Sequence, residues 1–390
     1  MKTKRIYIEE NMCTIYKLMI HKMQNVLLDN GYTLADTPSN ADILLAGVCA
    51  AFDADEYRSI AIVEKMKKTG KPLFIYGCMT KVNPQKLDNS LLYASWEADD
   101  LIRQLLLTGE RDAIFHQYKG ALPDTFRRKS DYRVYNPKKR FIGISTGCSF
   151  ECSYCPHKMG AGNIRSISQE DIIDMVVMAR DSGAETIVLT GIDTACYGSD
   201  IGTTFCTLLK EILQRIDGHI NIHIAQFNPE GLFLSPVYPQ MMIDLWSDPR
   251  IKDIQLPIQT GSQRLLEIMN RHYSMDSLDT FLSRLKDKNS NVMLRTDLMI
   301  GFPSETIEEL ESSIAFAIRH YSEVALYVFE MKQGTPIYNL NMPIVPPDEA
   351  QQRLRYASDK LRRSGLLVHS GGQKIETLLE NDRNKETFRR

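Results

Sequence analysis

The sequence has no apolar run long enough to cross a membrane. A membrane-spanning helix needs about 18 or more consecutive apolar residues, and no stretch of the 390 residues approaches that length. The chain starts MKTKRIYIEE, which leads into a strand-like pattern instead of the apolar segment of a secretory signal. We therefore expect a cytoplasmic protein with no membrane contact, of roughly two or three domains.

Cysteine and net charge are both scarce. Eight unevenly spaced cysteines are too few for a disulfide framework in a chain of this length, so a reducing compartment and metal or redox chemistry are expected. A net charge of −2 gives no overall attraction to nucleic acid. Residues 119–140 differ, because they hold eight Lys or Arg against two Asp. We interpret 121–140 as a basic interdomain linker, with phosphate contact as the alternative.

The first part of the chain alternates between strand-like and helix-like segments. The apolar segments RIYIE, ADILLAG and PLFIYG each resemble a short buried strand. Helical patterns at 16–30 and 53–69 lie between them, and a glycine follows each helix. This βαβαβ order predicts a doubly wound parallel-sheet domain over residues 1–120.

After the linker the alternation resumes and runs longer. Six strands are predicted, at 141–145, 186–190, 220–225, 253–258, 292–300 and 324–329. Two of the intervening helices begin with capping-box patterns, at Ser168 with Asp171 and at Thr306 with Glu309. The order predicts an α/β domain built as a partial (βα)6 TIM-type barrel over 141–345. A polar helix at 347–364 and a short tail then make up residues 346–390.

Three cysteines lie close together directly after the first barrel strand. Cys148, Cys152 and Cys155 form a C-x3-C-x2-C run. The run lies at the C-terminal mouth of the predicted barrel, where barrel enzymes have their active sites. Thiolates at this spacing favour zinc or an iron–sulfur cluster, and zinc would need a fourth ligand for which only His157 is near. A 4Fe–4S cluster on three thiolates leaves one iron open for a small molecule. The alternative is three incidental cysteines.

Three further cysteines are far apart in the first domain. Cys13, Cys49 and Cys78 each follow one of its predicted strands. The carboxyl ends of parallel strands build binding crevices at one edge of a sheet, so these thiols can converge on a second cluster. The alternative is that each is simply a small buried residue.

Several segments together carry a resemblance. GCSFECSYC resembles the cluster motif of the radical S-adenosylmethionine enzymes, and NMC, AGVCA and YGCMT are similar to the methylthiotransferases of that superfamily. LTGIDTACYG, LPIQTGSQRLLEIMNRHY, DLMIGFPSET and FEMKQGTP extend the resemblance to about residue 340. It implies two 4Fe–4S clusters and two S-adenosylmethionine molecules per turnover. One molecule methylates a sulfur associated with the second cluster, the other yields a radical that removes a substrate hydrogen, and the methylthio group joins the carbon. A reductant such as flavodoxin or ferredoxin is also implied.

The resemblance also implies contacts to S-adenosylmethionine. Tyr154 stands where the superfamily has an aromatic residue near the adenine. Asp193, Gln259 and Gly301 each follow a barrel strand and are expected at its mouth; a turn entering a capped helix is the alternative for Gly301. Arg295 and Asp297 share one face of a strand and are expected to contact the carboxylate or ribose, or else to pair with each other. Cys196 is expected to be an inert thiol, with a redox or substrate role as the alternative, and Cys206 to be core.

Two departures from the family pattern concern the substrate. In KMGAGNIRS the glycine Gly162 is kept, the usual arginine is absent and the order of Arg165 and Ser166 is reversed. Only GGQKIETLLEN resembles the start of the family's C-terminal TRAM barrel, so a complete TRAM domain is not expected.

The acceptor is predicted to be a peptide or protein side chain. GIDTACYG is more similar to the family branch that modifies an aspartate β-carbon of a ribosomal protein than to the branch that modifies a tRNA adenosine. The near-neutral charge also disfavours a large RNA. A tRNA acceptor, a two-cluster peptide-modifying enzyme of another outcome, and a metal-stabilised RNA-binding or scaffold module without turnover are the alternatives.

Overall fold

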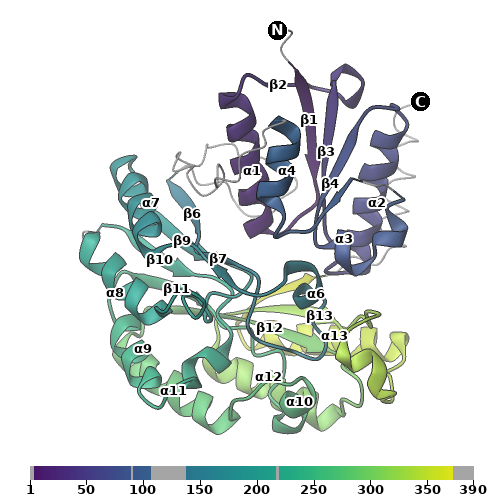
Figure 1. Cartoon of the computed structure of the whole chain (residues 1–390). Coiled ribbons are helices and arrows are strands. Elements are labelled where there is room, and N and C mark those ends of the chain that lie inside the picture. Colours follow the sequence, from purple (N-terminus) through teal and green to yellow (C-terminus); the bar gives the residue numbers. More distant parts are fainter. Residues whose placement is uncertain (1–3, 89–90, 107–137, 217–218, 372–390) are drawn as a thin grey trace. The chain divides into compact units, whose positions relative to one another are not determined.

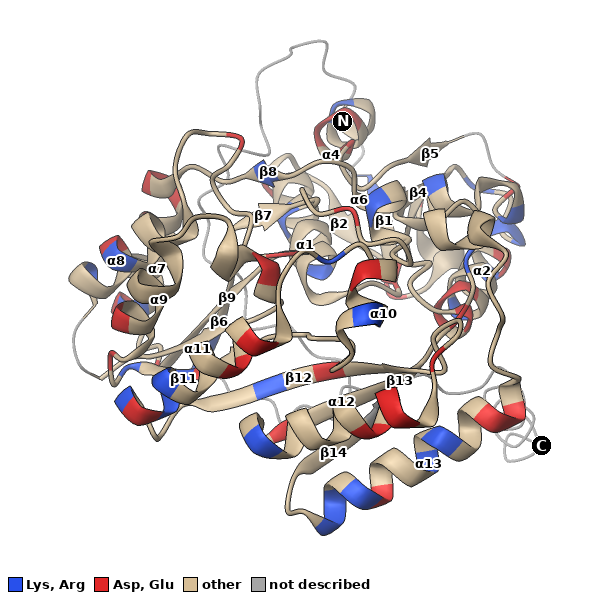
Figure 2. Cartoon of the chain, turned by 90° about the horizontal axis from the view of Figure 1, so that it is seen from below, with Lys and Arg blue, Asp and Glu red and all other residues tan. Residues whose placement is uncertain are grey.

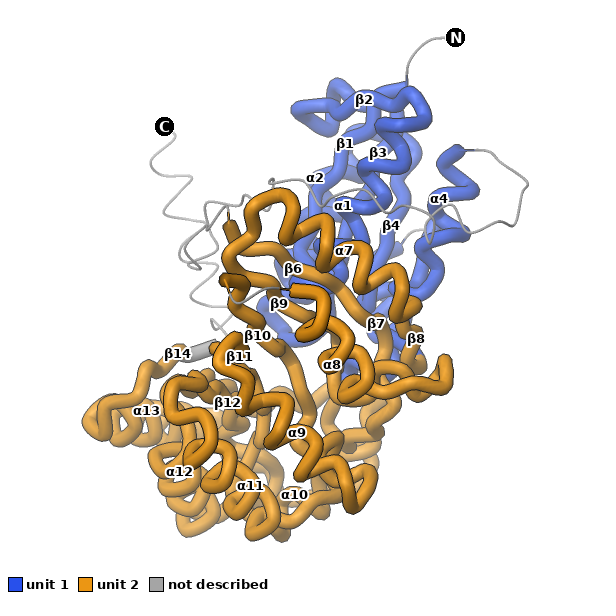
Figure 3. Tube along the Cα trace, turned by 90° about the vertical axis from the view of Figure 1, so that its left-hand side faces the viewer, with its two compact units in different colours: residues 1–120, 156–162, 372–390 blue, residues 121–155, 163–371 orange. Residues whose placement is uncertain are grey.

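The computed structural model describes residues 4–88, 91–106, 138–216 and 219–371. They form two compact units (Figure 3). Unit 1 consists of the described residues up to 106 and of 156–162, and unit 2 consists of 138–155 and 163–371. The predicted basic linker at 121–140 lies outside the described residues except for its last three positions. The tail segment GGQKIETLLEN lies outside them apart from Gly371, as does the rest of the tail.

Unit 1 is built on a five-stranded parallel sheet. Its strand order is β2-β1-β3-β4-β5, with the bounds β1 (Arg5–Glu10), β2 (Thr33–Leu34), β3 (Ile43–Val48), β4 (Leu73–Gly77) and β5 (Leu92–Tyr93). Its helical segments are α1 (Thr14–Asp29), η1 (Pro38–Asn40), α2 (Asp53–Lys67), α3 (Met79–Val82), η2 (Pro84–Lys86), α4 (Ala98–Leu106) and α6 (His157–Ala161). The βαβαβ prediction is confirmed. The two-residue strands β2 and β5 were not predicted, because so short a segment has no periodicity to detect.

The chain reverses direction along this sheet between β1 and β3. From β1 it moves to β2 at one edge, and from β3 it moves to β4 and β5 at the other. Right-handed crossovers in opposite directions put α1 and α2 on opposite faces of the sheet, as Figure 1 shows. The sheet is therefore doubly wound, and the carboxyl ends of β1 and β3 flank its topological switch point.

Unit 2 is an open parallel sheet of seven strands. The order is β14-β13-β12-β11-β10-β9-β6, with the bounds β6 (Lys139–Gly143), β9 (Thr186–Thr190), β10 (Asn221–Ile224), β11 (Ile251–Gln255), β12 (Met293–Ile300), β13 (Glu323–Val328) and β14 (Leu367–Gly371). Helical segments follow the strands in turn: α7 (Gln169–Asp181), α8 (Phe205–Arg215), η3 (Pro229–Phe233), α9 (Tyr238–Trp246), α10 (Gln263–Ile268), α11 (Met275–Lys288), α12 (Ile307–His320), η4 (Pro336–Leu340) and α13 (Pro347–Arg363). A small antiparallel pair, β7 (Ser145–Thr146) and β8 (Arg165–Ser166), stands beside the sheet.

The partial-barrel prediction is confirmed, with one strand more than the six predicted. β14 pairs in parallel with β13, so α13 and β14 form a further βα repeat of this sheet. Its sequence, LVHSG, has only two strongly apolar residues, which is too weak a signal for a strand. β11 also ends three residues earlier than predicted. Pro257 has no N–H to donate to a ladder and so cannot continue the strand.

The core of unit 2 lies between the sheet and its helices. Trp246 is fully buried and meets Phe227 and Phe281 edge to face, with ring centroids 5.2 and 5.7 Å apart. The helices along this face, α7, α8, α9, α11 and α12, are visible in Figure 1. Burial alternates strictly along β12, so one face of this strand packs in the core while the other faces the barrel interior.

Charged side chains of both signs are spread over the helices of unit 2 (Figure 2). The first turn of α13 holds Asp348 and Glu349 and its last turn holds Lys360, Arg362 and Arg363, which suits the helix dipole. Among the described residues, no helix has the length and apolar character needed to span a bilayer.

Candidate active site

The loop that carries Cys148, Cys152 and Cys155 is fixed at its centre. None of the three cysteines is in a disulfide, and all three are partly exposed. Ser153 lies between them and is buried, with its N–H donating to Met269 O (2.9 Å) and its hydroxyl to Ile268 O (2.7 Å). Both acceptors belong to the carboxyl end of α10, where carbonyls lack helical partners. The sequence thus places the three thiols on one loop, and α10 holds that loop.

Tyr154 directly precedes Cys155, and its side chain is held by Phe302 and Arg271. Its ring meets Phe302 edge to face, with centroids 6.3 Å apart, and its hydroxyl accepts from Arg271 Nη1 at 3.1 Å. Burial raises the pKa of Tyr154 well above its ordinary value. The ring is therefore held in one position, as an aromatic residue that contacts a cofactor would require.

The thiols on this loop have different neighbours. A hydrogen bond with the Cys196 thiol, and then burial, raise the pKa of Cys148. Burial raises the pKa of Cys152 to about 11, while the charge of Arg271 acts in the opposite direction. Cys196 is buried and its sulfur lies 3.6 Å from Asp193 O. Cys206 is buried in α8 against Met242, so the core prediction for it is confirmed.

Asp193 and Gln259 stand after β9 and β11. Asp193 is buried, its Oδ1 accepts from Ala195 N at 2.7 Å, and burial raises its pKa to about 7. Gln259 adopts a left-handed φ of 69° and forms a bridge with Leu298 of β12, donating to Asp297 O at 2.9 Å. A non-glycine residue in this region carries local strain, which is common at functional sites.

Arg295 and Asp297 do not pair with each other. Arg295 forms a two-pronged ion pair with Asp253 of β11, at 2.7 Å from Nε and 2.6 Å from Nη2. Asp297 accepts from the Gln255 side chain at 3.3 and 3.4 Å. Both contacts run diagonally between β11 and β12, because Gln255 is the residue directly opposite Arg295 and Asp253 is opposite Met293. Of the two expectations for these residues, their pairing with each other was wrong.

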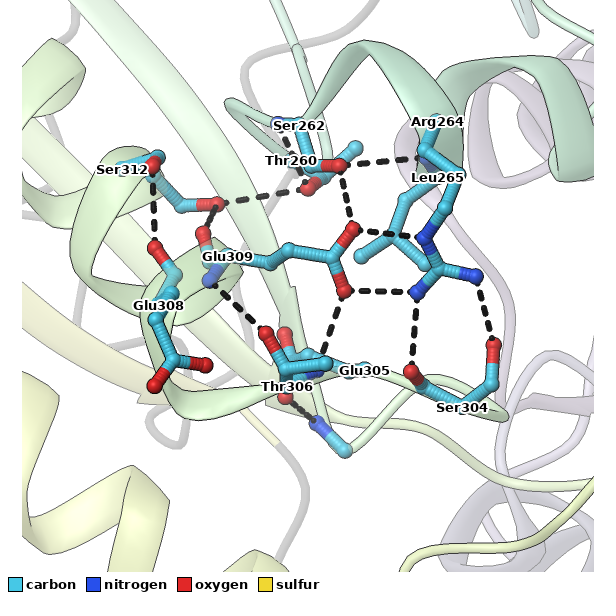
Figure 4. Close-up of polar contacts among 12 residues, drawn as sticks. Thr260, Ser262, Arg264, Leu265, Ser304, Glu305, Thr306, Glu308, Glu309 and Ser312 are labelled. Atoms are coloured by element: carbon cyan, nitrogen blue, oxygen red, sulfur yellow. Dashed lines mark hydrogen bonds and ion pairs between the residues drawn. The ribbon is translucent and has the colours of Figure 1, made fainter.

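The loop after β12 is fixed by polar contacts on both sides (Figure 4). Arg264 binds both Glu309 oxygens (2.9 and 2.7 Å) and donates to Ser304 O at 2.9 Å. Glu309 also completes the predicted capping box with Thr306. These side chains therefore hold the loop in shape, consistent with a structural role for the GFPSET segment.

Gly301 in this loop has a φ of 75°, which disfavours any residue with a side chain. A Cβ there would lie 2.9 Å from Ala350 Cβ, so the close approach at Gly301 is made by helix α13. Its N–H donates to Glu305 Oε2 at 2.8 Å. Burial raises the pKa of Glu305 to about 7 against the lowering effect of Arg353.

In unit 1, Cys13, Cys49 and Cys78 each follow a strand of the sheet, after β1, β3 and β4. Cys49 and Cys78 are buried and Cys13 is partly exposed. Burial raises the pKa of Cys49 well above its ordinary value, followed by the charges of Asp55, Cys78 and Cys13. The charges of Cys13 and Cys78 therefore act on the Cys49 thiol, and all three residues follow the carboxyl ends of their strands, the edge at which such sheets bind ligands.

The Met12 side chain packs against Gly47 and Gly77, two glycines near these cysteines. The Met12 side chain lies where a Cβ on Gly47 would be 2.7 Å from its sulfur and one on Gly77 2.6 Å from its methyl carbon. Gly77 is the last residue of β4, directly before Cys78, and Gly47 is the next-to-last residue of β3, two positions before Cys49. The missing side chains of both glycines make room for Met12. A flexible thioether fills such irregular gaps well.

Two residues that the sequence analysis missed hold the Cys49 loop. The buried Ser59 hydroxyl accepts from Cys49 N at 2.9 Å and lies 3.1 Å from Cys49 O. Asn11 donates to Ser59 Oγ at 3.2 Å and to Asp55 O at 2.9 Å. The segment before Cys13 and the loop of Cys49 are therefore tied to the same turn of α2. The sequence could not indicate the Asn11 contacts, because Asn11 follows β1 whereas Cys49 and Ser59 belong to the next βα unit of the sheet, β3 and α2.

Gly160 packs closely against Cys78. It lies in α6, which packs on α3, and a Cβ there would be 2.6 Å from Cys78 Cβ. Gly162 has a φ of 71°, and a Cβ on it would lie 2.9 Å from the Trp96 ring. Both glycines belong to KMGAGNIRS, so this segment packs closely on the Cys78 side of unit 1. Arg165 and Ser166 form β8 instead.

Among the described residues, no three Cys, His, Asp or Glu side chains are grouped as ligands of a single metal ion. A 4Fe–4S cluster makes a different demand, because each thiolate binds a different iron and the ligands stand farther apart. Both sets of cysteines supply sulfur, the donor that iron–sulfur clusters take. The donor chemistry of both sets therefore fits such clusters.

Two family matches cover most of the chain. Residues 142–317 match the Radical SAM superfamily, and residues 5–95 match the Uncharacterized protein family UPF0004. The chain is 28% identical to the probable threonylcarbamoyladenosine tRNA methylthiotransferase of Pyrococcus abyssi, over 80% of this chain and 73% of that protein. It is 27% identical to the ribosomal protein uS12 methylthiotransferase RimO of Crocosphaera subtropica, over 95% and 85%.

The chain belongs to the radical S-adenosylmethionine methylthiotransferases. It is accordingly an enzyme of the transferase class, and membership implies a 4Fe–4S cluster and S-adenosylmethionine.

A solved structure shares the fold. The radical S-adenosylmethionine methyltransferase TsrM of Kitasatospora setae, with cobalamin and a [4Fe–4S] cluster bound, aligns with a TM-score of 0.61 at 13% identity, over 86% of this chain and 77% of that one. The cobalamin-dependent S-adenosylmethionine radical enzyme OxsB aligns with a TM-score of 0.56 at 12% identity, over 99% of this chain and 62% of that one. At these identities the likeness concerns the fold alone.

Proposed function

We propose that this chain is a methylthiotransferase that works with two 4Fe–4S clusters. Cys148, Cys152 and Cys155 hold the first, and Cys13, Cys49 and Cys78 hold the second. The observation that carries the proposal is the placement of the second set, since three cysteines about 30 residues apart each follow a strand of one parallel sheet, and the charges of Cys13 and Cys78 act on the pKa of Cys49. Single incidental cysteines have no reason to stand at the ends of three neighbouring strands.

The first cluster, when bound, supplies an open iron at which S-adenosylmethionine can be held and reductively cleaved. This chain's own residues position that chemistry. Ser153 fixes the loop, Tyr154 offers a ring at the side of the third cysteine, and Asp193 and Gln259 stand after the neighbouring strands. Two S-adenosylmethionine molecules are used per turnover, with electrons from a reductant such as flavodoxin or ferredoxin.

The first candidate acceptor is an unactivated C–H of a peptide or protein side chain, with the aspartate β-carbon as the specific case. The support is the GIDTACYG loop, which places the buried Asp193 beside Cys196, and the near-neutral net charge of −2. A cytoplasmic location suits cysteines that form no disulfide at either site.

A tRNA adenosine is the second candidate. The relative from Pyrococcus abyssi carries a tRNA substrate in its name and the relative from Crocosphaera subtropica a ribosomal protein, and their identities to this chain are nearly equal. Mass spectrometry of both kinds of acceptor after turnover separates the candidates. Selective tRNA binding at physiological salt, with a methylthio group on an adenosine and none on protein, would exclude the peptide acceptor.

Iron and sulfide quantification tests the two-cluster proposal directly. Wild-type protein reconstituted under anaerobic conditions should hold about eight irons, and the Cys13→Ala/Cys49→Ala/Cys78→Ala variant about four. Methanethiol released by acid after incubation with S-adenosylmethionine should be lost in that variant. Cys206→Ala is the matched control, since Cys206 is a buried cysteine in the α8 core, and it should match the wild type. About four irons in both proteins would contradict the second cluster.

A further inference from the structure

Arg271 is a buried arginine just beyond helix α10. Its side chain is 4% exposed, and its N–H donates to Leu266 O at 2.9 Å, so it belongs to the helix end. Asn270 before it has a φ of 55°, which turns the chain sharply there. Arginine is rarely buried this completely unless a carboxylate neutralises it, because removing its charge from water is costly.

The partners of Arg271 are all neutral. Nη1 donates to Tyr154 Oη at 3.1 Å, and Nη2 donates to Asn228 Oδ1 at 2.6 Å and to Pro257 O at 2.7 Å. Nε is buried and has no hydrogen-bond partner. Among the described residues, no carboxylate lies within ion-pair distance of this guanidinium, whereas Arg295 pairs with Asp253 and Arg353 with Glu305 in the same unit.

Hydrogen bonds to neutral acceptors do not explain why a charged residue is buried at this position. A neutral donor could tie Tyr154 to Asn228 without the cost of burying a positive charge. The guanidinium also has spare donors, because a guanidinium carries five N–H groups and only three hydrogen bonds are made. Its carbon Cζ also lies 5.6 Å from the centroid of the Tyr273 ring, and its charge lowers the pKa of Cys152 and of the buried Asp193, neither of which forms an ion pair with it. A buried cation with unused donors beside the Cys152 thiol is therefore placed to meet the negative charge of a group bound by these cysteines.

We propose that Arg271 is a positioning residue that supplies the counter-charge for the iron–sulfur cluster held by Cys148, Cys152 and Cys155 and keeps Tyr154 in place beside it. The inference rests on the two-cluster function proposed above. Reduction adds one electron, and so one unit of negative charge, to the cluster and its thiolates. A fixed cation in a low-dielectric site favours that reduced form.

The measurement is the midpoint potential of this cluster, with dithionite as the one-electron reductant and the second cluster removed by the Cys13→Ala/Cys49→Ala/Cys78→Ala background. Arg271→Met should shift the reduction equilibrium at least tenfold towards the oxidised form, which is about 59 mV for a one-electron couple. Arg271→Lys keeps the charge and should restore most of the wild-type potential. Tyr154→Phe removes one hydrogen bond but no charge and should leave the potential unchanged.

A second variant tests the charge without removing the arginine. Asn228→Asp has the same shape and places a carboxylate 2.6 Å from Nη2. It should neutralise Arg271 and lower the potential as Arg271→Met does. This variant keeps the inference testable if Arg271→Met fails to hold its loop in place. Arg250→Met is the control, because Arg250 pairs with Asp248 before β11, at the opposite end of the strands.

The outcomes separate this inference from the function on which it rests. A wild-type protein that binds no cluster, or forms no 5′-deoxyadenosine from S-adenosylmethionine, overturns the proposed function itself. A wild-type protein that does both, with Arg271→Met and Asn228→Asp at the potential of Arg250→Met, overturns only the role of Arg271. A lowered potential in both variants, with recovery in Arg271→Lys, supports it.

Discussion

The two sets of cysteines are assembled in different ways. Cys148, Cys152 and Cys155 stand on one loop within eight residues of sequence, fixed by Ser153 and next to the cation of Arg271. Cys13, Cys49 and Cys78 follow three different strands, β1, β3 and β4, so the proposed second site depends on the whole sheet of unit 1. The first set is therefore local and the second distributed. A local set should tolerate changes elsewhere in its unit, whereas a distributed set should be lost with small displacements of any strand.

The largest effect should come from removing one cysteine of each set. Cys148→Ala should reduce 5′-deoxyadenosine formation to background, because the open iron and its S-adenosylmethionine depend on this loop. Cys49→Ala should keep 5′-deoxyadenosine formation and abolish the methylthiolated product. Liquid chromatography with mass detection measures both products in one reaction. Loss of 5′-deoxyadenosine in Cys49→Ala would show that the two sets are not separable in this way.

Gly160→Ala should disrupt the distributed set selectively. The added methyl would lie 2.6 Å from Cys78 Cβ, so Cys78 or α6 must move. Iron content should fall by about four per chain, with 5′-deoxyadenosine formation retained. Gly70→Ala is the matched control in the same unit: its φ of 67° makes the substitution strained, but nothing lies within 4 Å of the added carbon. Equal iron loss in both variants would mean general destabilisation instead of a displaced ligand.

Arg295→Met should weaken unit 2 without affecting its cysteine loop. The substitution leaves Asp253 buried without its two-pronged partner, which we expect to cost about 3 kcal/mol in the free energy of unfolding. The double variant with Asp253→Asn should regain much of this loss. Urea unfolding measures the stability, and iron content should stay unchanged. If the iron content of Arg295→Met fell in proportion to its free energy of unfolding, the local set would be as sensitive to distant changes as the distributed set, which would contradict the comparison.

A smaller effect concerns the pH dependence of the same unit. Burial lowers the pKa of His223 in β10 from 6.5 to about 4, although Asp253 acts in the opposite direction. Between these values the unfolded chain binds a proton that the folded protein does not, so stability is full above pH 6.5 and falls as the pH drops towards 4. We expect a loss of about 2 kcal/mol, allowing for the partly exposed ring.

His223→Leu should remove this part of the pH dependence. Urea unfolding of both proteins at pH 7 and pH 5 gives the difference, in which the contributions of other groups cancel. Parallel pH profiles for the two proteins would contradict the assignment to His223.

Much of the chemistry was visible in the sequence. The C-x3-C-x2-C run defines its thiols by spacing alone, and the strands before Cys13, Cys49 and Cys78 were found because each is a short apolar run. Strand β14 was missed since its sequence has only two strongly apolar residues. The alternative that Arg295 pairs with Asp297 was wrong because Arg295 forms its ion pair with Asp253 on the neighbouring strand. The residue pattern along one strand does not show which residue of the neighbouring strand its side chains will contact.

The sequence by itself determined which thiols exist and which strand each one follows, because these properties depend on residue type and on local periodicity. Only the tertiary structure decided what holds them. Ser59 reaches the Cys49 backbone, Gly160 meets Cys78, and Arg271 reaches Tyr154 from 117 residues away. These contacts join segments whose separation along the chain is arbitrary, so they arise from packing and from the need to satisfy buried polar groups.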